Sequence, residues 1–323
     1  MVESPQLGED QKKGRGTIEA DLILLHAPSV YDFRERDDIL FAYLSDSDSV
    51  NVTSIYEMYP LGFFSIAQHL RERGKKVEII NLAALMLLHP SLNIDALLAR
   101  LRAPVFGIDL HWMCHCHGSI EIATRLKAIH PDCTVIFGGI SATYYAQELA
   151  RYPSVDVAVK GYDTLAPVDM LVGEVMRGSR DFSKIPNLVY KDAKGELRAT
   201  DFSYKPMLNY NDAPTDWSWY AKVRGTVKTS RAIMTLPNTG CAYDCPGAAA
   251  PAMPIATLWE SRGRWLRRIP NTSMRNCAAW VKPQRLRPST RCNATPRPRR
   301  ECTSFWTLSA SLVTGASFSS NSI

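Results

Sequence analysis

Short apolar runs alternate with stretches of helical periodicity through the first half of the chain. An apolar run bounded by turn residues is typical of a buried β-strand, and such runs occur at 21–26, 77–82, 105–110, 134–137 and 155–159. Between them, apolar residues recur at helical spacing, which predicts helices at 60–74, 94–101, 118–129, 142–151 and 164–176. This alternation indicates a doubly wound, Rossmann-like α/β domain over 20–180, with a five-stranded parallel sheet covered on both faces.

The ends of these strands are where such a fold binds ligands. In a doubly wound sheet the site lies beyond the carboxyl ends of the strands, where the strand order reverses. The first of these loops lacks G-x-G-x-x-G, which argues against a dinucleotide site. Glycines in the later loops let a ligand approach the backbone closely. We therefore expect a wide, flat ligand over this edge, lined by Pro28, Ser29, His111, Trp112, Gly138, Gly139, Ser141, Gly161 and Tyr162.

The segments on either side of this domain have weaker patterns. Residues 1–19 are polar and have no apolar core, so they are predicted to be a disordered lead-in and not a secretory signal. Residues 181–230 are predicted to be a connector containing a hairpin, 188–191 with 196–198. Within the connector, the aromatic cluster at 216–220 is expected to pack one domain on the next.

The composition narrows the class of protein. At 323 residues the chain is long enough for two domains. It has no run of about 18 apolar residues, so no membrane span is expected. Its eight cysteines, without a secretory signal, indicate reduced thiols or metal ligands in a cytoplasmic protein.

The net charge of +6 is unevenly distributed along the chain. Residues 246–323 hold 12 of the 38 Lys and Arg residues and only two acidic ones, Glu260 and Glu301. The rest of the chain is therefore slightly acidic. A basic pI on its own favours nucleic-acid binding. Because the excess charge lies in one tail, no specific nucleic-acid partner is expected.

Two groups of residues could bind metal. Three histidines and two cysteines crowd the segment 109–118, but zinc sites of this kind usually have a second ligand pair at a distance, and this domain offers none. Zinc there remains an alternative. In the loop 235–245, Cys241 and Cys245 lie four residues apart, and a third cysteine at position 248 would supply three thiolates for a 4Fe–4S cluster. That position is Ala248.

Several of these stretches together resemble one family. HAPS, YPLGFFSIAQHL, GIDLHW, FGGISAT and DVAVKGYDT resemble the N-terminal half of B12-binding-domain radical SAM proteins. TLPNTGCAYDC resembles the start of their radical SAM barrel, which would place that domain's first strand and cysteine loop at 231–245. The resemblance covers residues 20 to 245.

The resemblance implies a cofactor set and a reaction class. The domain over 20–180 would be of the cobalamin-binding type. Cys241 and Cys245 would be the first two ligands of a 4Fe–4S cluster, whose open iron binds S-adenosylmethionine and cleaves it to a radical. The family would act on a small-molecule substrate, by methyl transfer or rearrangement, with an electron donor such as flavodoxin or ferredoxin.

One motif within the domain departs from a related pattern. Asp109-x-His111 is similar to the D-x-H-x-x-G loop that supplies an axial histidine to cobalamin in some families. Here Cys114 stands where that motif has Gly, and the loop follows the third predicted strand instead of the first. His111 is therefore expected to line the pocket and not to ligate cobalt.

The tail after Cys245 loses both helical and strand periodicity and is rich in Arg, Pro, Ala and Ser. Restoring one base before Gly247 in a GC-rich back-translation reads C-A-Y-D-C-P-W-C, with the third cysteine at the family's spacing. We therefore hypothesise that residues 246–323 are an out-of-frame translation and that this chain is catalytically defective. The alternatives are a non-catalytic cobalamin-binding module and a doubly wound domain that binds a nucleotide or flavin.

Overall fold

The computed structural model describes residues 16–35, 61–161, 164–204 and 218–224, together with two strands of two residues each further along. Those strands, β10 (Asn238–Thr239) and β11 (Leu266–Arg267), pair antiparallel. Tyr162, Cys241 and Cys245 lie outside the described residues, and so does the strand predicted near Arg231.

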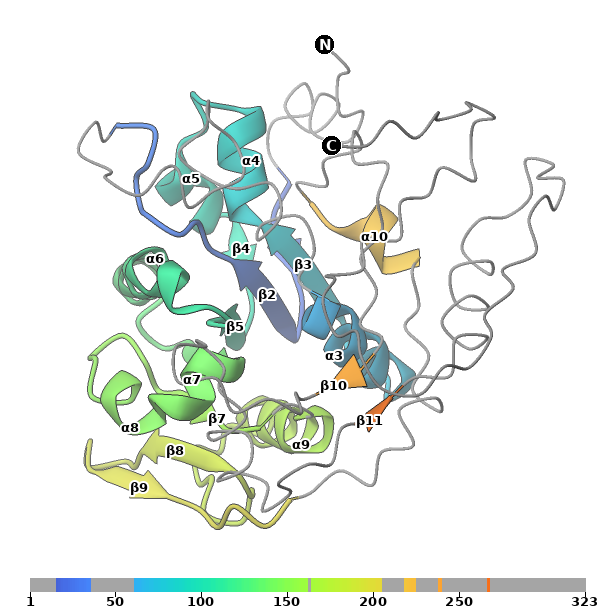
Figure 1. Cartoon of the computed structure of the whole chain (residues 1–323), viewed down its shortest axis with the longest axis vertical. Coiled ribbons are helices and arrows are strands. Elements are labelled where there is room, and N and C mark those ends of the chain that lie inside the picture. Colours follow the sequence, from blue (N-terminus) through green and yellow to red (C-terminus); the bar gives the residue numbers. More distant parts are fainter. Residues whose placement is uncertain are drawn as a thin grey trace, which may run out of the picture.

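A seven-stranded sheet forms the centre of the domain (Figure 1). In spatial order its strands are β3 (Val77–Asn81), β2 (Leu22–His26), β5 (Val105–Asp109), β6 (Thr134–Gly138), β7 (Val157–Val159), β8 (Leu188–Lys191) and β9 (Leu197–Ala199). The first five are parallel, so the five predicted strands are confirmed.

The predicted hairpin is also confirmed, but it belongs to the sheet. β8 pairs antiparallel with β7, and β9 pairs antiparallel with β8, so the sheet has seven strands and not five. The turn between them closes through the amide of Asp192, which donates to the Glu196 carbonyl at 2.9 Å. Because Leu188, Val189 and Tyr190 are buried, the hairpin covers an edge that β7 would otherwise leave open.

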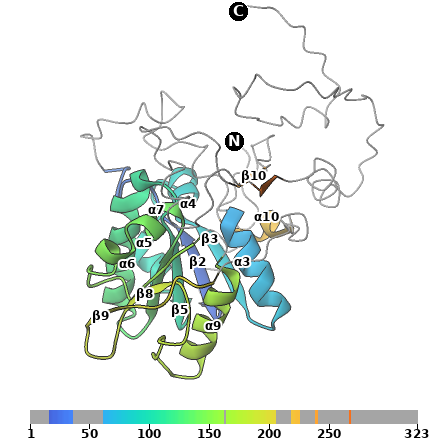
Figure 2. The ribbon, with the colours of Figure 1, turned by 60° about the horizontal axis from the view of Figure 1, so that its bottom comes forward.

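Helices cover both faces of the sheet (Figure 2). One face carries α3 (Leu61–Glu72) and α9 (Leu165–Met176), which pack against each other. The other carries α4 (Leu82–Leu88), α5 (Ile94–Leu98), α6 (Cys116–Ile129), α7 (Ile140–Tyr144) and α8 (Ala146–Leu149). None of the helices that the structure describes is long and apolar enough to cross a bilayer.

Two helical features differ from the sequence prediction. α4 was not predicted, because its sequence LAALMLL is apolar all round and continues the apolar run of β3 without helical periodicity. Its start is set by Asn81, whose side-chain oxygen accepts from the Ala84 amide at 2.9 Å. The single helix predicted at 142–151 is two short helices, interrupted at Tyr145 (φ −101°, ψ 29°).

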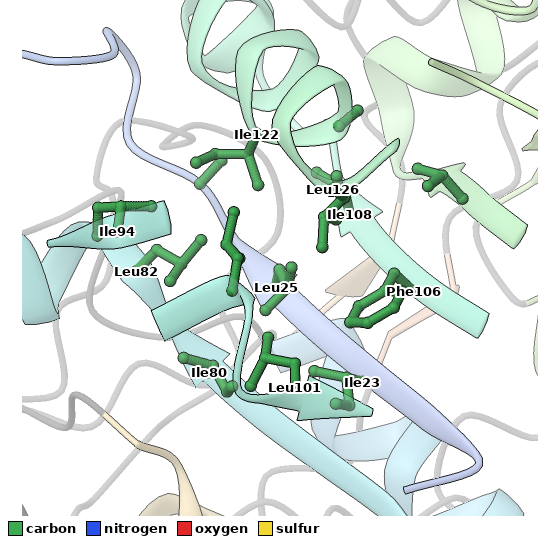
Figure 3. Close-up of a cluster of buried hydrophobic side chains, with 14 of the residues drawn as sticks. Ile23, Leu25, Ile80, Leu82, Ile94, Leu101, Phe106, Ile108, Ile122 and Leu126 are labelled. Atoms are coloured by element: carbon green, nitrogen blue, oxygen red, sulfur yellow. The ribbon is translucent and has the colours of Figure 1, made fainter. Parts of the chain in front are cut away.

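The core follows from the alternation of side chains along the strands. Ile23 and Leu25 of β2 lie in one buried cluster with Ile122 and Leu126 of α6 (Figure 3). Successive strand residues point to opposite faces, so Leu22 and Leu24 fall in a second cluster, with the apolar stripes of α3 and α9. The central strands are therefore buried on both faces, as their continuous apolar sequences predict.

The connector returns to the opposite edge of the sheet. Arg224 lies beside β3, where its carbonyl accepts from the Asn81 amide at 2.8 Å and its amide donates to the Ile79 carbonyl at 3.0 Å. Just before it, α10 (Ser218–Lys222) carries Trp219, which is buried in the cluster that includes α3. The part of the aromatic cluster that the structure describes thus packs on the first domain itself.

A small parallel pair completes this part of the fold. β1 (Ile18–Glu19) pairs with β4 (Leu101–Arg102), which ties the beginning of the described chain to the segment before β5.

Candidate ligand site at the carboxyl edge of the sheet

The strand order creates a switch point between β2 and β5. The chain leaves β2 toward α3 on one face, and it leaves β5 toward α6 on the other. At such a switch point a ligand can lie at the carboxyl edge of the sheet. The loops after β6 and β7 continue the same edge. The loops predicted to line the site therefore lie at one edge of the sheet. Tyr162, which was also predicted to line it, is outside the described residues.

His26 and Asp109 pair across the switch point. The parallel register aligns Leu25 with Ile108, so the next position brings His26 opposite Asp109 on the same face of the sheet. His26 Nδ1 lies 2.9 and 2.8 Å from the two carboxylate oxygens. The His26 side chain is 4% exposed and that of Asp109 is 18% exposed. The pair therefore joins the carboxyl ends of β2 and β5.

The charge of Asp109 is stabilised by its surroundings. Burial by itself would raise the pKa of this carboxyl, but the charge and hydrogen bond of His26, with His115 and His111 nearby, hold the pKa below its ordinary value. Asp109 is thus an anion among three imidazoles. His115 is also buried, and its ring centroid lies 5.3 Å from that of His26.

The loop after β2 is held against α6. The amide of Gly118 donates to the Ser29 carbonyl at 3.2 Å, and a Cβ added at Gly118 would lie 1.8 Å from the Pro28 carbonyl oxygen. Only glycine permits this approach. One turn of α6 also ties to β5, because the Ser119 hydroxyl donates to the Asp109 carbonyl at 3.2 Å. Pro28 and Ser29 therefore line the edge through a fixed backbone.

The two adjacent glycines at the end of β6, Gly138 and Gly139, have different surroundings. Gly139 has φ 111°, and a Cβ there would meet the backbone of Leu110 at 2.8 Å, so this glycine serves close packing of the β5 and β6 loops. A Cβ at Gly138 would have no described atom within 4 Å. Of the pair, Gly138 therefore presents open backbone at the edge.

The two hydroxyl groups at the start of α7 join neighbouring loops. Ser141, which was predicted to contact the ligand, is buried, and its hydroxyl donates to the His111 carbonyl at 3.1 Å. The Thr143 hydroxyl donates to the Gly139 carbonyl at 2.8 Å and accepts from the Gly161 amide at 3.0 Å. Both hydroxyl groups therefore hold the loops in place.

His111 and Trp112 lie at the rim of this edge. Their rings meet edge to face with centroids 5.1 Å apart, and His111 is exposed. Desolvation by the neighbouring protein atoms lowers the His111 pKa, partly opposed by the charge of Asp109. The residues that the structure describes contain no group of three His, Cys, Asp or Glu side chains arranged to hold a metal ion. The zinc alternative for 109–118 therefore has no support from the geometry.

Two residues of this site, His26 and Thr143, were not identified from the sequence, and His115 was considered only as one of the possible zinc ligands in 109–118. His26 ends an apolar strand, and its partner is 83 positions away, so no local pattern reveals the pair. Thr143 lies two residues after Ser141 in a short helix, where a hydroxyl is ordinary. Only the order of the strands brings these groups to one edge.

The family comparison agrees with this arrangement. Residues 48–171 match the family model of the B12 binding domain. The match spans β3, β5, β6 and β7 with their carboxyl-end loops up to Gly161. This part of the chain is therefore similar to B12 binding domains, and the Rossmann-like fold expected from the sequence is confirmed. No curated protein sequence matches the chain.

One solved structure has a similar fold. The chain is similar to the cobalamin-dependent S-adenosylmethionine radical enzyme OxsB with aqua-cobalamin and S-adenosylmethionine bound, at a TM-score of 0.50 and 14% sequence identity. That alignment covers 85% of this chain and 33% of the other. OxsB with aqua-cobalamin alone and apo, selenomethionine-labelled OxsB each align at a TM-score of 0.47. At this identity the likeness concerns the fold, and the chain spans about a third of the length of these enzymes.

Proposed function

We propose that the carboxyl edge of the sheet binds cobalamin. The observation that carries the proposal is the match of residues 48–171 to the B12 binding domain, on a sheet whose edge loops are held in place. A corrinoid is wide and flat, and it needs an edge where backbone can come close to it. Gly138, where an added Cβ would have no described atom within 4 Å, supplies such a position.

The residues of the edge divide into two roles in this proposal. Pro28, Ser29, Gly138, His111 and Trp112 face the ligand, with Tyr162 as a further candidate outside the described residues. Gly139, Ser141 and Gly161 shape the edge by packing and hydrogen bonding. Bound cobalamin supplies an organometallic cobalt centre, and the protein orients it and keeps water away.

His111 is a pocket residue in this proposal and not a cobalt ligand. An imidazole that binds a metal usually has its other nitrogen fixed by a carboxylate or carbonyl. Asp109, the carboxylate two residues earlier, binds His26 instead. The described structure thus gives His111 no carboxylate to orient it toward cobalt.

We propose further that the chain derives from a radical S-adenosylmethionine enzyme. Two features support this: the TLPNTGCAYDC loop and the domain order, in which the cysteine loop follows the B12-binding domain. Cys241 and Cys245 would hold a 4Fe–4S cluster together with a third cysteine, in place of which this chain has Ala248. Two thiolates are too few for a stable cluster of this kind. The activity proposed for this exact polypeptide is therefore cofactor binding without radical chemistry.

The tail hypothesis belongs to the same proposal. Sequencing the gene across the codons for Cys245 to Ala250 tests whether residues 246–323 are out of frame. An in-frame Ala248 with no neighbouring insertion or deletion would contradict the hypothesis. Anaerobic reconstitution with iron and sulfide tests the cluster separately, and a near-stoichiometric 4Fe–4S signal would contradict the predicted defect.

Retention of hydroxocobalamin by the full chain tests the central proposal. We expect the protein to keep the corrinoid through gel filtration at micromolar concentration, with a corrinoid absorption spectrum. A flavin or nucleotide should not be retained under the same conditions. Retention of flavin in place of hydroxocobalamin would overturn the proposal and favour a doubly wound flavin-binding domain.

A further inference from the structure

The Thr143 hydroxyl joins two loops that are far apart in sequence. Thr143 is 6% exposed and lies in α7, directly after the β6 loop. Its Oγ1 donates to the Gly139 carbonyl at 2.8 Å and accepts from the Gly161 amide at 3.0 Å. A single buried hydroxyl therefore connects the loop after β6 with the loop after β7.

Both glycines that it binds have backbone conformations that favour glycine. Gly139 has φ 111° and Gly161 has φ 124°, values that side-chain-bearing residues rarely adopt. Glycine is also the residue that loses most conformational freedom when its backbone is fixed. A free loop at either position would have to be ordered when a ligand binds, and this ordering weakens binding. The Thr143 hydroxyl is hydrogen-bonded to the backbone of both loops.

An ordinary helical hydrogen bond accounts for only half of this arrangement. Threonine hydroxyls often donate to the carbonyl four residues earlier, as Thr143 does to Gly139. Thr124 in α6 makes the same kind of bond, to the Ile120 carbonyl at 2.9 Å. Thr124 contacts Ser154 and lies away from the edge loops. What distinguishes Thr143 is the bond accepted from Gly161, 18 residues later.

We propose that Thr143 is a positioning residue that preforms the ligand edge by fixing the Gly139 and Gly161 loops relative to each other. The inference rests on the proposed cobalamin binding, because the ligand is what the edge would be preformed for. Thr143 itself is buried and acts through the two loops. Its contribution is to the affinity of the edge for a flat, rigid ligand such as a corrinoid.

Three variants of the full chain test this role. Thr143→Val keeps the shape of the side chain and removes the hydroxyl, and Thr143→Ser keeps the hydroxyl. Thr124→Val is the control in α6, where an exposed threonine makes the same bond to the carbonyl four residues earlier. The first measurement is hydrogen exchange of the peptide that contains Gly161, without ligand. The second is the dissociation constant for hydroxocobalamin, and the third is the urea unfolding midpoint.

The expected pattern separates positioning from general stability. In Thr143→Val the Gly161 amide loses its acceptor and should exchange faster, and hydroxocobalamin affinity should fall roughly tenfold. Thr143→Ser should restore both the exchange and the affinity, and Thr124→Val should leave both unchanged. A residue that only stabilised the fold would lower the urea midpoint in Thr143→Val and leave the affinity of the folded protein unchanged.

Each adverse result has a distinct meaning. Faster Gly161 exchange with unchanged affinity in Thr143→Val would overturn the positioning role. Unchanged exchange would show that the hydroxyl does not hold the Gly161 loop, whatever the affinity. If the wild-type chain does not retain hydroxocobalamin, the proposed function fails together with the role inferred for Thr143, and the exchange data still decide whether the two loops are joined.

Discussion

The His26 imidazole lies 2.8 Å from the Asp109 carboxylate and joins the carboxyl ends of two parallel strands, β2 and β5. These strands flank the switch point of the sheet, so the pair forms the base of the candidate ligand site. Removing one partner of such a pair destabilises the fold, because it leaves the other charge buried without compensation. Because Asp109 pairs with His26, it does not bind His111, which lies two residues later at the rim of the site.

Replacing Asp109 with Asn should lower stability in a pH-dependent way. The folded-state pKa of Asp109 is lower than its ordinary value, so its contribution is present above about pH 4 and is lost as the pH falls through the folded-state pKa. Urea unfolding should show the variant less stable by about 1–3 kcal/mol at neutral pH. The difference from wild type should shrink in acid.

Asp95→Asn is the control for this experiment. Asp95 pairs with Arg125 at 2.7 Å, but its side chain is 53% exposed. An exposed pair contributes at most about 1 kcal/mol, so this variant should remain close to wild type at both pH values. A difference between Asp109→Asn and wild type that stayed constant into acid would contradict the assignment.

His26→Gln tests whether the two residues act together. In a double-mutant cycle with Asp109→Asn, residues in direct contact should show a coupling energy of roughly 0.5–3 kcal/mol. The cycle is measured by urea unfolding at neutral pH. Additive effects of the two substitutions would mean that the contact between the His26 ring and the Asp109 carboxylate contributes nothing to stability.

Gly118→Ala should disrupt the contact between α6 and the β2 loop. The new Cβ would lie 1.8 Å from the Pro28 carbonyl oxygen, so backbone has to move. Overpacking of this kind costs about 1–3 kcal/mol, measured by thermal or urea unfolding. The control is Gly62→Ala in α3, where no described atom lies within 4 Å and helix propensity favours alanine by up to about 1 kcal/mol. Equal effects at the two sites would contradict this reading of Gly118.

Substitutions at Gly138 and Gly139 distinguish a residue that contacts the ligand from one that serves packing. Gly139→Ala should destabilise the fold, because φ is 111° and the new Cβ would meet Leu110 at 2.8 Å. Gly138→Ala should leave the unfolding midpoint unchanged and weaken hydroxocobalamin binding. Spectral titration and urea unfolding give both quantities. If Gly138→Ala binds as well as wild type, the ligand does not approach this backbone.

Cobinamide, which lacks the nucleotide base of cobalamin, tests the role of His111. A protein imidazole on cobalt would add nitrogen splitting to the Co(II) EPR lines, and cobinamide has no base of its own to do so. We expect no such splitting in wild type and the same spectrum in His111→Ala. Nitrogen splitting that disappears in the variant would make His111 a cobalt ligand.

Local patterns predicted most of the elements. The apolar strand runs identified the five parallel strands, and the helical periodicity identified the helices of both faces in outline. α4 was not predicted, because an all-apolar segment has no periodicity that separates it from the strand before it. The hairpin at 188–199 was identified as a hairpin, but its place in the sheet depends on an antiparallel return to β7 that no local pattern contains.

The candidate site shows the same division. Glycines at strand ends and the order of elements along the chain predict a ligand at the carboxyl edge, since parallel strands end together. Which side chains meet there depends on strand order and register: His26 reaches Asp109 because β2 and β5 are neighbours, and Thr143 reaches Gly161 because β6 and β7 are. Periodicity is a property of neighbouring residues, whereas these contacts join residues many positions apart, and only the folded sheet brings them within hydrogen-bonding distance.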